Sequence, residues 1–494
     1  MGKSEVSNRE HKSSLGLIGL IAIVFSSMVG GGIFNIAQNM ASTAGLASVV
    51  IGWLITGVGM IFLVLTFKLL SDRFPNQNQG LYQYIRDGFG NYAGFNIAWG
   101  YWLCVALGNV AFVIMLNDAA GAFFPVLLSH RWESIVFSEC IIWIIYFVVK
   151  RGVMTASFIN TVMTCLKFGA IFIIIAILVV YLRIDLLFSD VWGETTIEGT
   201  ESLGGLESQV MGTMFITMFC FVGIEGGIML SSYAKRSKDV GRASVIGFYL
   251  ALIIYALISI LCYGIRSREE LATLHDPSVA YVLRLCCGEW AYYFVICTVI
   301  VSILSAFISW TLLCVQTPYG AAKVNIFPKE FLNTNKDDVP VYGLTLTTIF
   351  MSFFIVIVCT APDVYMAALN LTTVMVLPAY AMSGAYLMKV SGWNINSDSN
   401  FSLQQKRKGS LIGCLCLIYC IWCILAGGFL LFIASSILYL IGFYFYYITY
   451  RQKSLTDHRQ EKLLTPGEKI IFYIIGAASV VSIVLICTGN ITLS

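Results

Sequence analysis

Charged residues are scarce in this chain of 494 residues: they make up 12% of it, against about 25% in an ordinary soluble domain. Hydrophobic residues make up 58%, and the mean hydropathy is +0.82. This composition excludes a soluble globular domain and predicts an integral membrane protein. The net charge is +3, and the basic residues form no stripe along the sequence. We therefore expect no nucleic-acid partner.

Histidine is also scarce, with four residues, and no spacing of histidine and cysteine resembles a zinc site. The fifteen cysteines are scattered within apolar segments, where we interpret them as small buried hydrophobic residues. No nucleophile, metal ligand set or acid–base pair falls at a common depth, and neither end carries a soluble signalling domain. We therefore expect no metal, no cofactor and no enzyme activity.

A secretory signal is missing as well, because residues 1–14 are polar and the apolar run that follows, 15–41, is too long for one. Crossing a bilayer core of about 30 Å takes about 20 apolar residues. Counting such runs predicts thirteen membrane spans. They lie at residues 15–41, 46–70, 92–122, 133–149, 153–182, 207–233, 240–265, 286–321, 340–361, 364–388, 409–428, 430–450 and 468–489.

Lysine and arginine collect in cytoplasmic loops of membrane proteins, and here they fall mainly on one side of the predicted spans. With the N-terminus inside, 24 of the 30 basic residues lie in cytoplasmic segments. Lys167 lies within a span, and the outer segments hold Arg131, Arg183, Arg266, Arg268 and Arg284. The distribution predicts a cytoplasmic N-terminal tail at residues 1–14.

Three consecutive glycines, Gly30, Gly31 and Gly32, lie in the middle of the first span. Each weakens a helix by roughly 1 kcal/mol relative to alanine, so we expect this span to unwind at mid-depth. Freed backbone groups are tolerated inside a bilayer only where they line a cavity or bind a ligand. Our hypothesis is a broken-helix binding site for a small zwitterionic solute. The alternative is a close helix–helix contact, which glycine also permits.

A second glycine-interrupted segment lies in the sixth span, at Gly223, Gly226 and Gly227. Because five spans separate the start of one broken segment from the start of the other, the two cross the membrane in opposite directions. That arrangement is typical of an inverted repeat with its binding site at the midplane. The second break therefore favours the binding-site interpretation.

Four motifs in this order resemble the amino acid/polyamine/organocation transporter superfamily. They are the triple glycine, the segment Phe221-Val222-Gly223-Ile224-Glu225, the basic loop at 235–242, and Trp310-Thr311-Leu312-Leu313 followed by Ile326-Phe327-Pro328. Within the superfamily, residues 15–450 are most similar to the basic amino acid/polyamine antiporters, particularly the arginine/agmatine and arginine/ornithine exchangers.

The resemblance implies an all-α integral membrane protein with a LeuT-like five-plus-five inverted repeat, broken helices 1 and 6, and 12–13 transmembrane helices. It divides the chain into a first repeat at 15–183, a second, inverted repeat at 207–389, and accessory helices at 409–494. The span at 468–489 departs from the twelve-helix family pattern and leaves the side of the C-terminus open. The resemblance also implies a homodimer in the bilayer of a bacterial plasma membrane.

The resemblance also implies how the charged head of an amino acid is bound. Gly31 and Gly32, next to Gly30, would hold the carboxylate with backbone N–H groups at the N-terminus of a half-helix. The carbonyls of Met28, Phe219 and Val222 would accept from the ammonium group.

Side chains would then select the tail of a cationic amino acid or polyamine. Three aromatic residues match the family pattern, with Trp310 as the residue that stacks on the tail. Aromatic residues form 14% of the chain, however, and most aromatic residues pack against lipid or neighbouring helices. Intramembrane asparagine likewise often only joins helices. The candidates are Tyr101, Phe219 and Trp310 for aromatic contact, and Asn109, Thr372 and Thr373 for hydrogen bonds to a guanidinium or distal amine.

Two ionisable residues lie at depth, where burial of charge is costly and points to function. By resemblance, Glu225 senses pH or sets a field suited to a cationic substrate, and Phe219 beside it is a candidate gate. Lys167 occupies what would be a sodium site in related transporters. It is either a fixed cation that bridges the first and eighth helices or a lysine that titrates during transport.

Three functions follow from this sequence. The leading one is exchange of a cationic amino acid, arginine, for its product agmatine or ornithine by alternating access. The alternative is proton-coupled uptake of amino acids, for which Lys167 is the main argument. A remote third is a membrane sensor that transports nothing.

Overall fold

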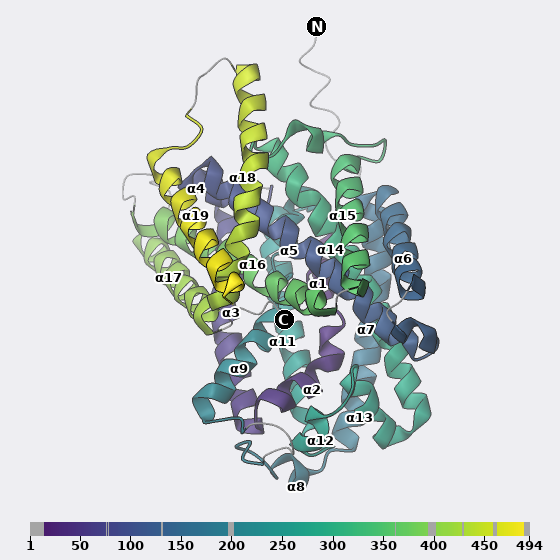
Figure 1. Ribbon diagram of the computed structural model, residues 1–494. Coiled ribbons are helices and arrows are strands. Elements are labelled where there is room, and N and C mark those ends of the chain that lie inside the picture. The colour runs from purple at the N-terminus through teal and green to yellow at the C-terminus, as the bar shows by residue number, and fades with distance from the viewer. Residues whose placement is uncertain are drawn as a thin grey trace.

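The computed structural model describes residues 14–75, 77, 79–129, 132–195, 202–360, 362–393, 402–426, 429–457 and 462–488. The predicted N-terminal tail lies outside these residues except for Ser14. Within the described part the chain is helical, and its extended pairings are two isolated bridges, Leu15 with Ala234 and Thr334 with Pro340. The prediction of an all-α membrane protein is confirmed (Figure 1).

Twelve spans in the described residues are long and apolar enough to cross a membrane. The first consists of two helices, α1 and α2. The span at Leu371–Gly392 runs from α16 into the short element η4 (Lys389–Trp393), and each of the others is formed by one helix. The helices of these spans are α1 (Leu17–Met28), α2 (Gly32–Thr43), α3 (Leu46–Arg73), α5 (Asn91–Gly121), α6 (Trp132–Lys150), α7 (Val153–Val180), α11 (Ser237–Cys262), α14 (Glu289–Lys323), α15 (Val341–Thr360), α16 (Pro362–Met388), α17 (Leu403–Ala426), α18 (Phe429–Asp457) and α19 (Pro466–Cys487).

Shorter elements connect these helices or form the sixth predicted span. They are α4 (Leu81–Phe89), η1 (Pro125–Ser129), α8 (Ile184–Leu187), α9 (Leu206–Phe219), α10 (Gly226–Met229), η2 (Ser231–Tyr233), α12 (Arg268–Ala272), α13 (Ser278–Cys287), η3 (Lys329–Leu332) and η4 (Lys389–Trp393). The helices α9 and α10 are individually too short to count among the twelve. They lie at the sixth predicted span, so that span is not among the twelve found, and the predicted total of thirteen stays a prediction.

Both predicted helix breaks are present. α1 ends at Met28 and α2 begins at Gly32, so the glycine run falls at the interruption. α9 ends at Phe219 and α10 begins at Gly226. Between them Gly223 has φ +106°, a left-handed backbone conformation that glycine adopts without the penalty a side chain would bring.

The long helices α5 and α14 form the centre of the molecule, packed along each other (Figure 1). α5 is buried along its apolar stretch, and α14, α16 and α4 all pack against it. α1 lies against α7, α11 and α14, so the first break is enclosed by central helices. The division into two five-helix groups and their relation as inverted repeats stay predictions.

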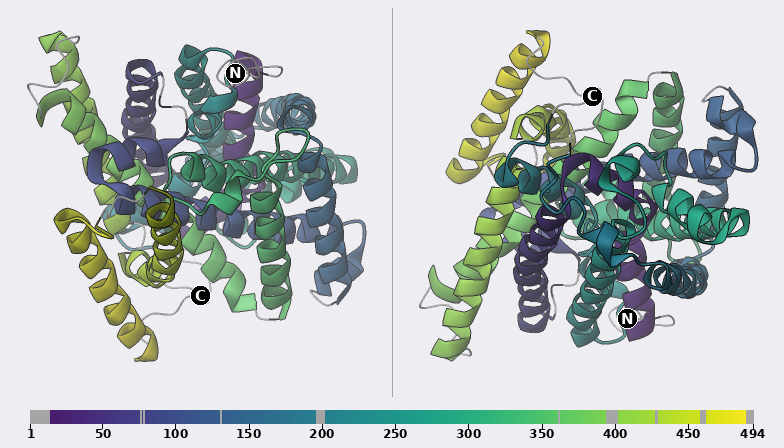
Figure 2. Two further views of the ribbon diagram at one scale, coloured as in Figure 1. Left: turned by 90° about the horizontal axis from the view of Figure 1, so that it is seen from above. Right: turned by 90° about the horizontal axis from the view of Figure 1, so that it is seen from below.

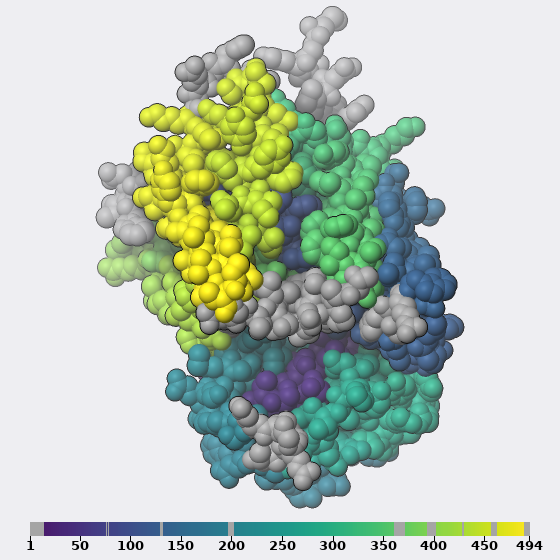
Figure 3. Space-filling model, viewed as in Figure 1, coloured from purple at the N-terminus to yellow at the C-terminus, as the bar shows by residue number. Residues whose placement is uncertain are grey.

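The C-terminal helix α19 lies at the edge of the molecule in both views of Figure 2 and on the surface in Figure 3. It packs mainly on α18. Its first turn is held by a capping box in which Thr465 and Glu468 exchange hydrogen bonds. The Glu468 carboxylate also accepts from the backbone N–H of Tyr92 at 2.8 Å, which ties the start of α19 to the start of α5.

Candidate functional site

The two helix breaks touch each other. The Ser27 hydroxyl donates to the Gly223 carbonyl at 2.8 Å, and a Cβ atom at Gly223 would lie within 2.9 Å of Ser27 atoms. No side chain fits at that spacing, so glycine is required at position 223 for close approach as well as for its positive φ. The Trp310 indole N–H donates to the Ser27 carbonyl at 2.8 Å and brings α14 to the same point.

The end of α1 presents carbonyl groups that the protein itself engages. The Tyr255 hydroxyl donates to the Met28 carbonyl at 3.0 Å. The Ser302 hydroxyl lies 2.8 Å from the Gly30 carbonyl and 3.2 Å from that of Val29. A carbonyl accepts two hydrogen bonds, so Met28 keeps one acceptor position for the predicted ammonium group.

The start of α2 presents N–H groups without such partners. Gly31 is the N-cap residue and no side chain caps the helix, whereas the first N–H groups of any α-helix have no partner within it. Gly31, Gly32 and Ile33 therefore offer donors at the positive end of the helix dipole, where an anion is stabilised. This is the chemistry required to hold a carboxylate.

The three glycines differ in their surroundings. A Cβ on Gly30 would lie 2.9 Å from the Phe112 ring, and one on Gly31 would lie 2.5 Å from the Met115 side chain. One on Gly32 would meet only Phe219, at an ordinary 3.5 Å. Close helix packing thus accounts for Gly30 and Gly31 in part, while the binding of a ligand by this run stays a prediction. At Gly32 packing leaves room for a side chain.

Phe219 and Val222 belong to the sixth segment. Phe219 is the last residue of α9, and its half-buried ring lies next to Gly32, across the start of α2. Val222 is buried within the break, and its N–H donates to the Phe219 carbonyl at 3.2 Å. The ring position is compatible with the predicted gate at the carboxylate end of the site.

Glu225 is fully buried directly before α10. Tyr101 donates to one carboxylate oxygen at 2.7 Å, and Tyr380 donates to the other at 2.5 Å. The Gly223 N–H lies 3.3 Å from the same oxygen as Tyr380. Among the described residues, no lysine or arginine lies within ion-pair distance of Glu225. The carboxyl group is therefore bound by tyrosine hydroxyls, with no described cation beside it.

Trp310 and Asn109 lie on the two central helices. The Trp310 ring packs edge-on against Phe112, with centroids 5.0 Å apart, and fills the space over Gly108. Asn109, about two turns beyond Tyr101 on α5, is fully buried, and neither its oxygen nor its nitrogen has a partner among the described residues. A buried unpaired amide costs about 1–3 kcal/mol, so a ligand or water that binds it is favoured.

Thr372 and Thr373 are buried on α16, and the Cys104 thiol of α5 lies 3.2 Å from the Thr372 carbonyl. These contacts join α16 to α5 beside Tyr101. The structure therefore assembles the predicted residues of the first, third, sixth, eighth and tenth spans around the two breaks. Their roles toward a substrate stay predictions.

Lys167 is fully buried on α7, and its side chain reaches the end of α1 at the first break. Its ammonium group lies 2.6 Å from the Val29 carbonyl and 3.2 Å from the Ser26 hydroxyl. Ser302 of α14 shares the Val29 carbonyl with it. No carboxylate lies within ion-pair distance of Lys167 among the described residues. Its ammonium group instead meets backbone and hydroxyl oxygens and the face of the Phe25 ring, 5.7 Å from the ring centroid.

Sequence reasoning missed several polar residues that complete the site. Each is a single hydroxyl or amide in an apolar helix, and only the helix rotation tells whether it points toward a break. The prediction that the two breaks pair does not tell how the surrounding helices are rotated about their axes. These residues are Asn160, Tyr255, Ser302, Ser305 and Tyr380.

An all-helical membrane protein in which two interrupted helices meet at a site of bare backbone groups is a multi-pass transporter of the broken-helix class. Comparison with known proteins gives the family. A model described as "Amino acid permease" matches residues 15–394. The chain belongs to this family, which lies within the superfamily that its motifs resemble.

Curated relatives cover nearly the whole chain. An "Arginine/agmatine antiporter" of Chlamydia pneumoniae is 35% identical over 98% of this chain and 99% of its own. An "Arginine/ornithine antiporter" of Pseudomonas aeruginosa is 36% identical over 88% of this chain and 90% of its own. A "Putative amino-acid transporter" of Clostridium perfringens is 36% identical over 87% of this chain.

Proposed function

We propose that this protein exchanges arginine for agmatine or ornithine across the membrane by alternating access. The names of the relatives support the substrates, and the described contacts support how an amino acid would be bound. The observation that carries the proposal is the buried Glu225 carboxylate, which has two tyrosine donors and no cation within ion-pair distance among the described residues. A buried charge without a partner is costly, so a site with this carboxylate favours a cationic solute.

In this proposal the substrate lies between the two breaks. Its carboxylate binds the N–H groups at Gly31 and Gly32, and its ammonium binds the free acceptor positions at Met28, Phe219 and Val222. The side chain extends along α5 toward Asn109, whose unpaired oxygen accepts from a guanidinium or amine. Thr372 and Thr373 contribute from α16, and Trp310 stacks on the cationic tail once its ring leaves Phe112.

The transport cycle follows from the same contacts. Phe219 closes the start of α2, and rocking of one helix group against the other opens the site to either side. A second candidate function is proton-coupled uptake, favoured by the position of Lys167 at the first break. Its ammonium group would leave the Val29 carbonyl when the lysine loses a proton, which would couple the break to protonation.

Counterflow in proteoliposomes separates these functions. Vesicles loaded with agmatine, ornithine or no substrate take up labelled arginine with and without an imposed membrane potential. Exchange requires stimulation by the internal substrate. Arginine for agmatine moves one net charge and responds to the potential, whereas arginine for ornithine does not. Uptake that needs a pH gradient but no internal substrate would reject exchange in favour of proton coupling.

The remaining expectations belong to the same proposal. The distribution of basic residues supports a cytoplasmic N-terminus in a bacterial plasma membrane, and thirteen crossings would then place the end of α19 outside. The two five-helix groups at 15–183 and 207–389 would be inverted repeats. A homodimer with one pathway in each protomer follows from the family resemblance. Cysteine labelling at residue 488 from either side of the membrane tests the topology.

A further inference from the structure

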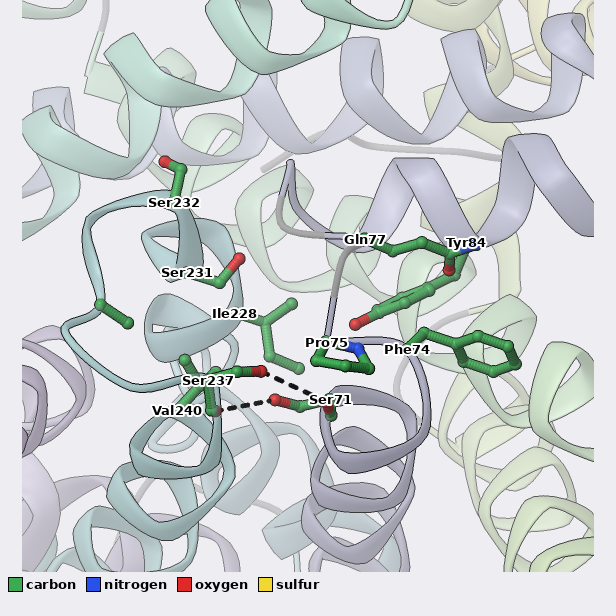
Figure 4. Close-up of a pocket in the computed structure, with 11 residues that line it drawn as sticks. Ser71, Phe74, Pro75, Gln77, Tyr84, Ile228, Ser231, Ser232, Ser237 and Val240 are labelled. Atoms are coloured by element: carbon green, nitrogen blue, oxygen red, sulfur yellow. Dashed lines mark hydrogen bonds between the residues drawn. The ribbon is translucent and has the colours of Figure 1, made fainter. Parts of the chain in front are cut away.

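A polar cavity of about 160 Å³ lies at the end of the molecule that holds α4, apart from the two breaks (Figure 4). It opens between the end of α3, the short helix α4, the turn η2 and the start of α11. Its lining includes Ser71, Phe74, Tyr84, Ile228, Ser231 and Ser237. None of the residues that line it is charged. An engineered cavity of about 150 Å³ holds benzene, so this one has room for a small ion such as phosphate.

Two hydroxyl groups in this cavity lack partners. Tyr84 is 2% exposed and makes no hydrogen bond to a described residue, and Figure 4 shows its hydroxyl directed toward Ile228 and Pro75. The Ser231 hydroxyl, on the opposite wall, is buried and also unpaired among the described residues. The Ser71 hydroxyl donates to the Ser237 backbone carbonyl at 3.3 Å and the Ser237 hydroxyl donates to the Ser71 carbonyl at 3.5 Å, so both are held by long hydrogen bonds that a ligand can replace. The cavity therefore offers two hydroxyl donors, those of Tyr84 and Ser231, that nothing in the described chain uses.

The charges around the cavity favour an anion. Lys235, Arg236 and Lys238 flank Ser237 and are exposed. The start of α11, a helix of 26 residues, adds the positive end of its dipole. Against these stand Asp239, 3.8 Å from Arg242, and Asp87, which accepts from Arg86 and from Gln77. The charged groups around the cavity are therefore more often positive than negative. This argues against an organic cation bound on the Phe74 and Tyr84 rings.

We propose that this cavity binds the phosphate group of a small oxyanion or of a lipid headgroup, through the hydroxyls of Tyr84, Ser231, Ser71 and Ser237. The Arg86 side chain bonds the Val324 carbonyl at 2.9 Å and fixes α4 to the end of α14. Ser231 and Ser237 follow the broken sixth segment. A phosphate between them ties that segment to α4, so it holds this end of the transporter closed and slows exchange.

Thermal unfolding of the purified full-length protein tests binding without reference to transport. Potassium phosphate is compared with potassium chloride at equal ionic strength. We expect phosphate to raise the melting temperature of the wild type, and Tyr84→Phe and Ser231→Ala each to remove at least half of that rise. Tyr82→Phe and Ser244→Ala are matched controls, since both residues are buried but do not line the cavity, and these variants should keep the full rise.

Three results would overturn the proposal. The first is that phosphate does not raise the melting temperature of the wild type, and the second is that it raises that of Tyr84→Phe and Ser231→Ala equally. The third result is stabilisation by ammonium chloride that these variants abolish. A rise from arginine that Tyr84→Phe and Ser231→Ala retain shows that they fold and that the central site is separate. If arginine gives no rise, the proposed function is in doubt while the phosphate result still stands.

Vesicle composition separates the two sources of phosphate. In phosphatidylcholine vesicles, phosphate on the α4 side should slow exchange at least two-fold in the wild type and not in Tyr84→Phe. If phosphatidylglycerol slows exchange and removes the effect of added phosphate, the headgroup is the occupant. An undiminished effect of added phosphate in phosphatidylglycerol identifies the free ion. Exchange that is insensitive to both would overturn the proposed closure.

Discussion

The ammonium group of Lys167 lies 2.6 Å from the carbonyl oxygen of Val29, so a charge on α7 holds the broken end of α1. Lys167→Met keeps the length of the side chain and removes the charge. We expect exchange to fall at least ten-fold, because a hydrogen bond to a charged group contributes about 1.5–3 kcal/mol. Counterflow of labelled arginine measures the fall, and Leu166→Met, a change at the exposed neighbouring residue on α7, is the control.

The pH profile separates the two interpretations of Lys167. A fixed structural cation predicts that the residual exchange of Lys167→Met keeps the pH profile of the wild type between pH 5 and 8. A lysine that titrates during transport predicts that this profile becomes flat. A variant with both the wild-type rate and the wild-type profile would exclude both roles.

The glycines of the first break are predicted to respond differently to added bulk. Gly32→Val places a side chain over the N–H groups of α2, where the structure has room beside Phe219. We expect at least a ten-fold loss of arginine affinity with little change in melting temperature. Gly31→Val would also contact Met115 and Ile303, so it should lower the melting temperature as well. Thermal shift with and without arginine measures both effects.

Gly169→Val is the matched control for these substitutions. Gly169 lies in α7 with no atom within 4 Å of an added Cβ, so the same change there should leave affinity unaltered. If Gly32→Val bound arginine as tightly as the wild type, the backbone of α2 would not be the carboxylate site. Close packing alone would then explain the glycine run.

The breaks themselves could be predicted because their cause is local. Glycine destabilises a helix wherever it stands, and the freed backbone groups need a partner at that depth. The run at Gly30 and the second cluster at Gly223 carried this information without any knowledge of the neighbouring helices. The resemblance to a transporter family added the order of the helices around the breaks.

The partners of the buried charges could not be predicted, because they depend on how helices rotate against each other. Tyr380 donates to Glu225 from a helix 155 positions away in the sequence, and one hydroxyl among many tyrosines carries no local signal. Trp310 was predicted as a stacking platform, yet its indole N–H bonds the Ser27 carbonyl. An apolar helix with a hydrophobic residue on every face gives no periodicity from which to read such a register.

The hydroxyl pair on Glu225 leads to a prediction about selectivity. Glu225→Gln removes the charge but keeps the shape, so we expect arginine affinity to fall at least ten-fold while affinity for a neutral amino acid stays the same or rises. Tyr380→Phe removes one donor, and should weaken arginine binding less than Glu225→Gln does. Competition of unlabelled amino acids against labelled arginine gives both affinities.

Tyr439→Phe is the control for the loss of a tyrosine hydroxyl, since Tyr439 is buried and bonds the Met375 carbonyl away from Glu225. Equal losses for arginine and for neutral amino acids in Glu225→Gln would contradict a role in selecting charge. They would assign Glu225 to the folding of the sixth segment instead.

A buried ion pair at the other end of the molecule predicts a pH-dependent stability. Arg268 of α12 bonds the Asp190 carboxylate at 2.8 Å, the Ala41 carbonyl at the end of α2 at 3.2 Å, and the Thr195 carbonyl. The side chains are 2% and 12% exposed. Burial alone would raise the pKa of Asp190, but hydrogen bonds from Arg268 and from the Glu194 N–H hold the pKa below its ordinary value.

A carboxyl group whose pKa is lowered by folding stabilises the folded state above its unfolded pKa, about 3.9 for aspartate. Asp190→Asn should therefore lower the free energy of unfolding by about 1–3 kcal/mol at pH 7. The difference from the wild type should stay constant down to about pH 5. It should shrink as the pH falls further, through the pKa of the folded state.

Melting temperatures of the wild type and of Asp190→Asn between pH 3 and 8 measure this difference. Asp185→Asn, in α8 of the same connecting segment and without a described bond to Arg268, should show no such difference. A gap between wild type and Asp190→Asn that widens toward acid pH would reverse the sign and contradict the ion pair as its source. An unchanged gap at pH 3 would show that the loss does not depend on the carboxylate charge. It would assign the loss to the hydrogen bonds that an amide in this place cannot accept.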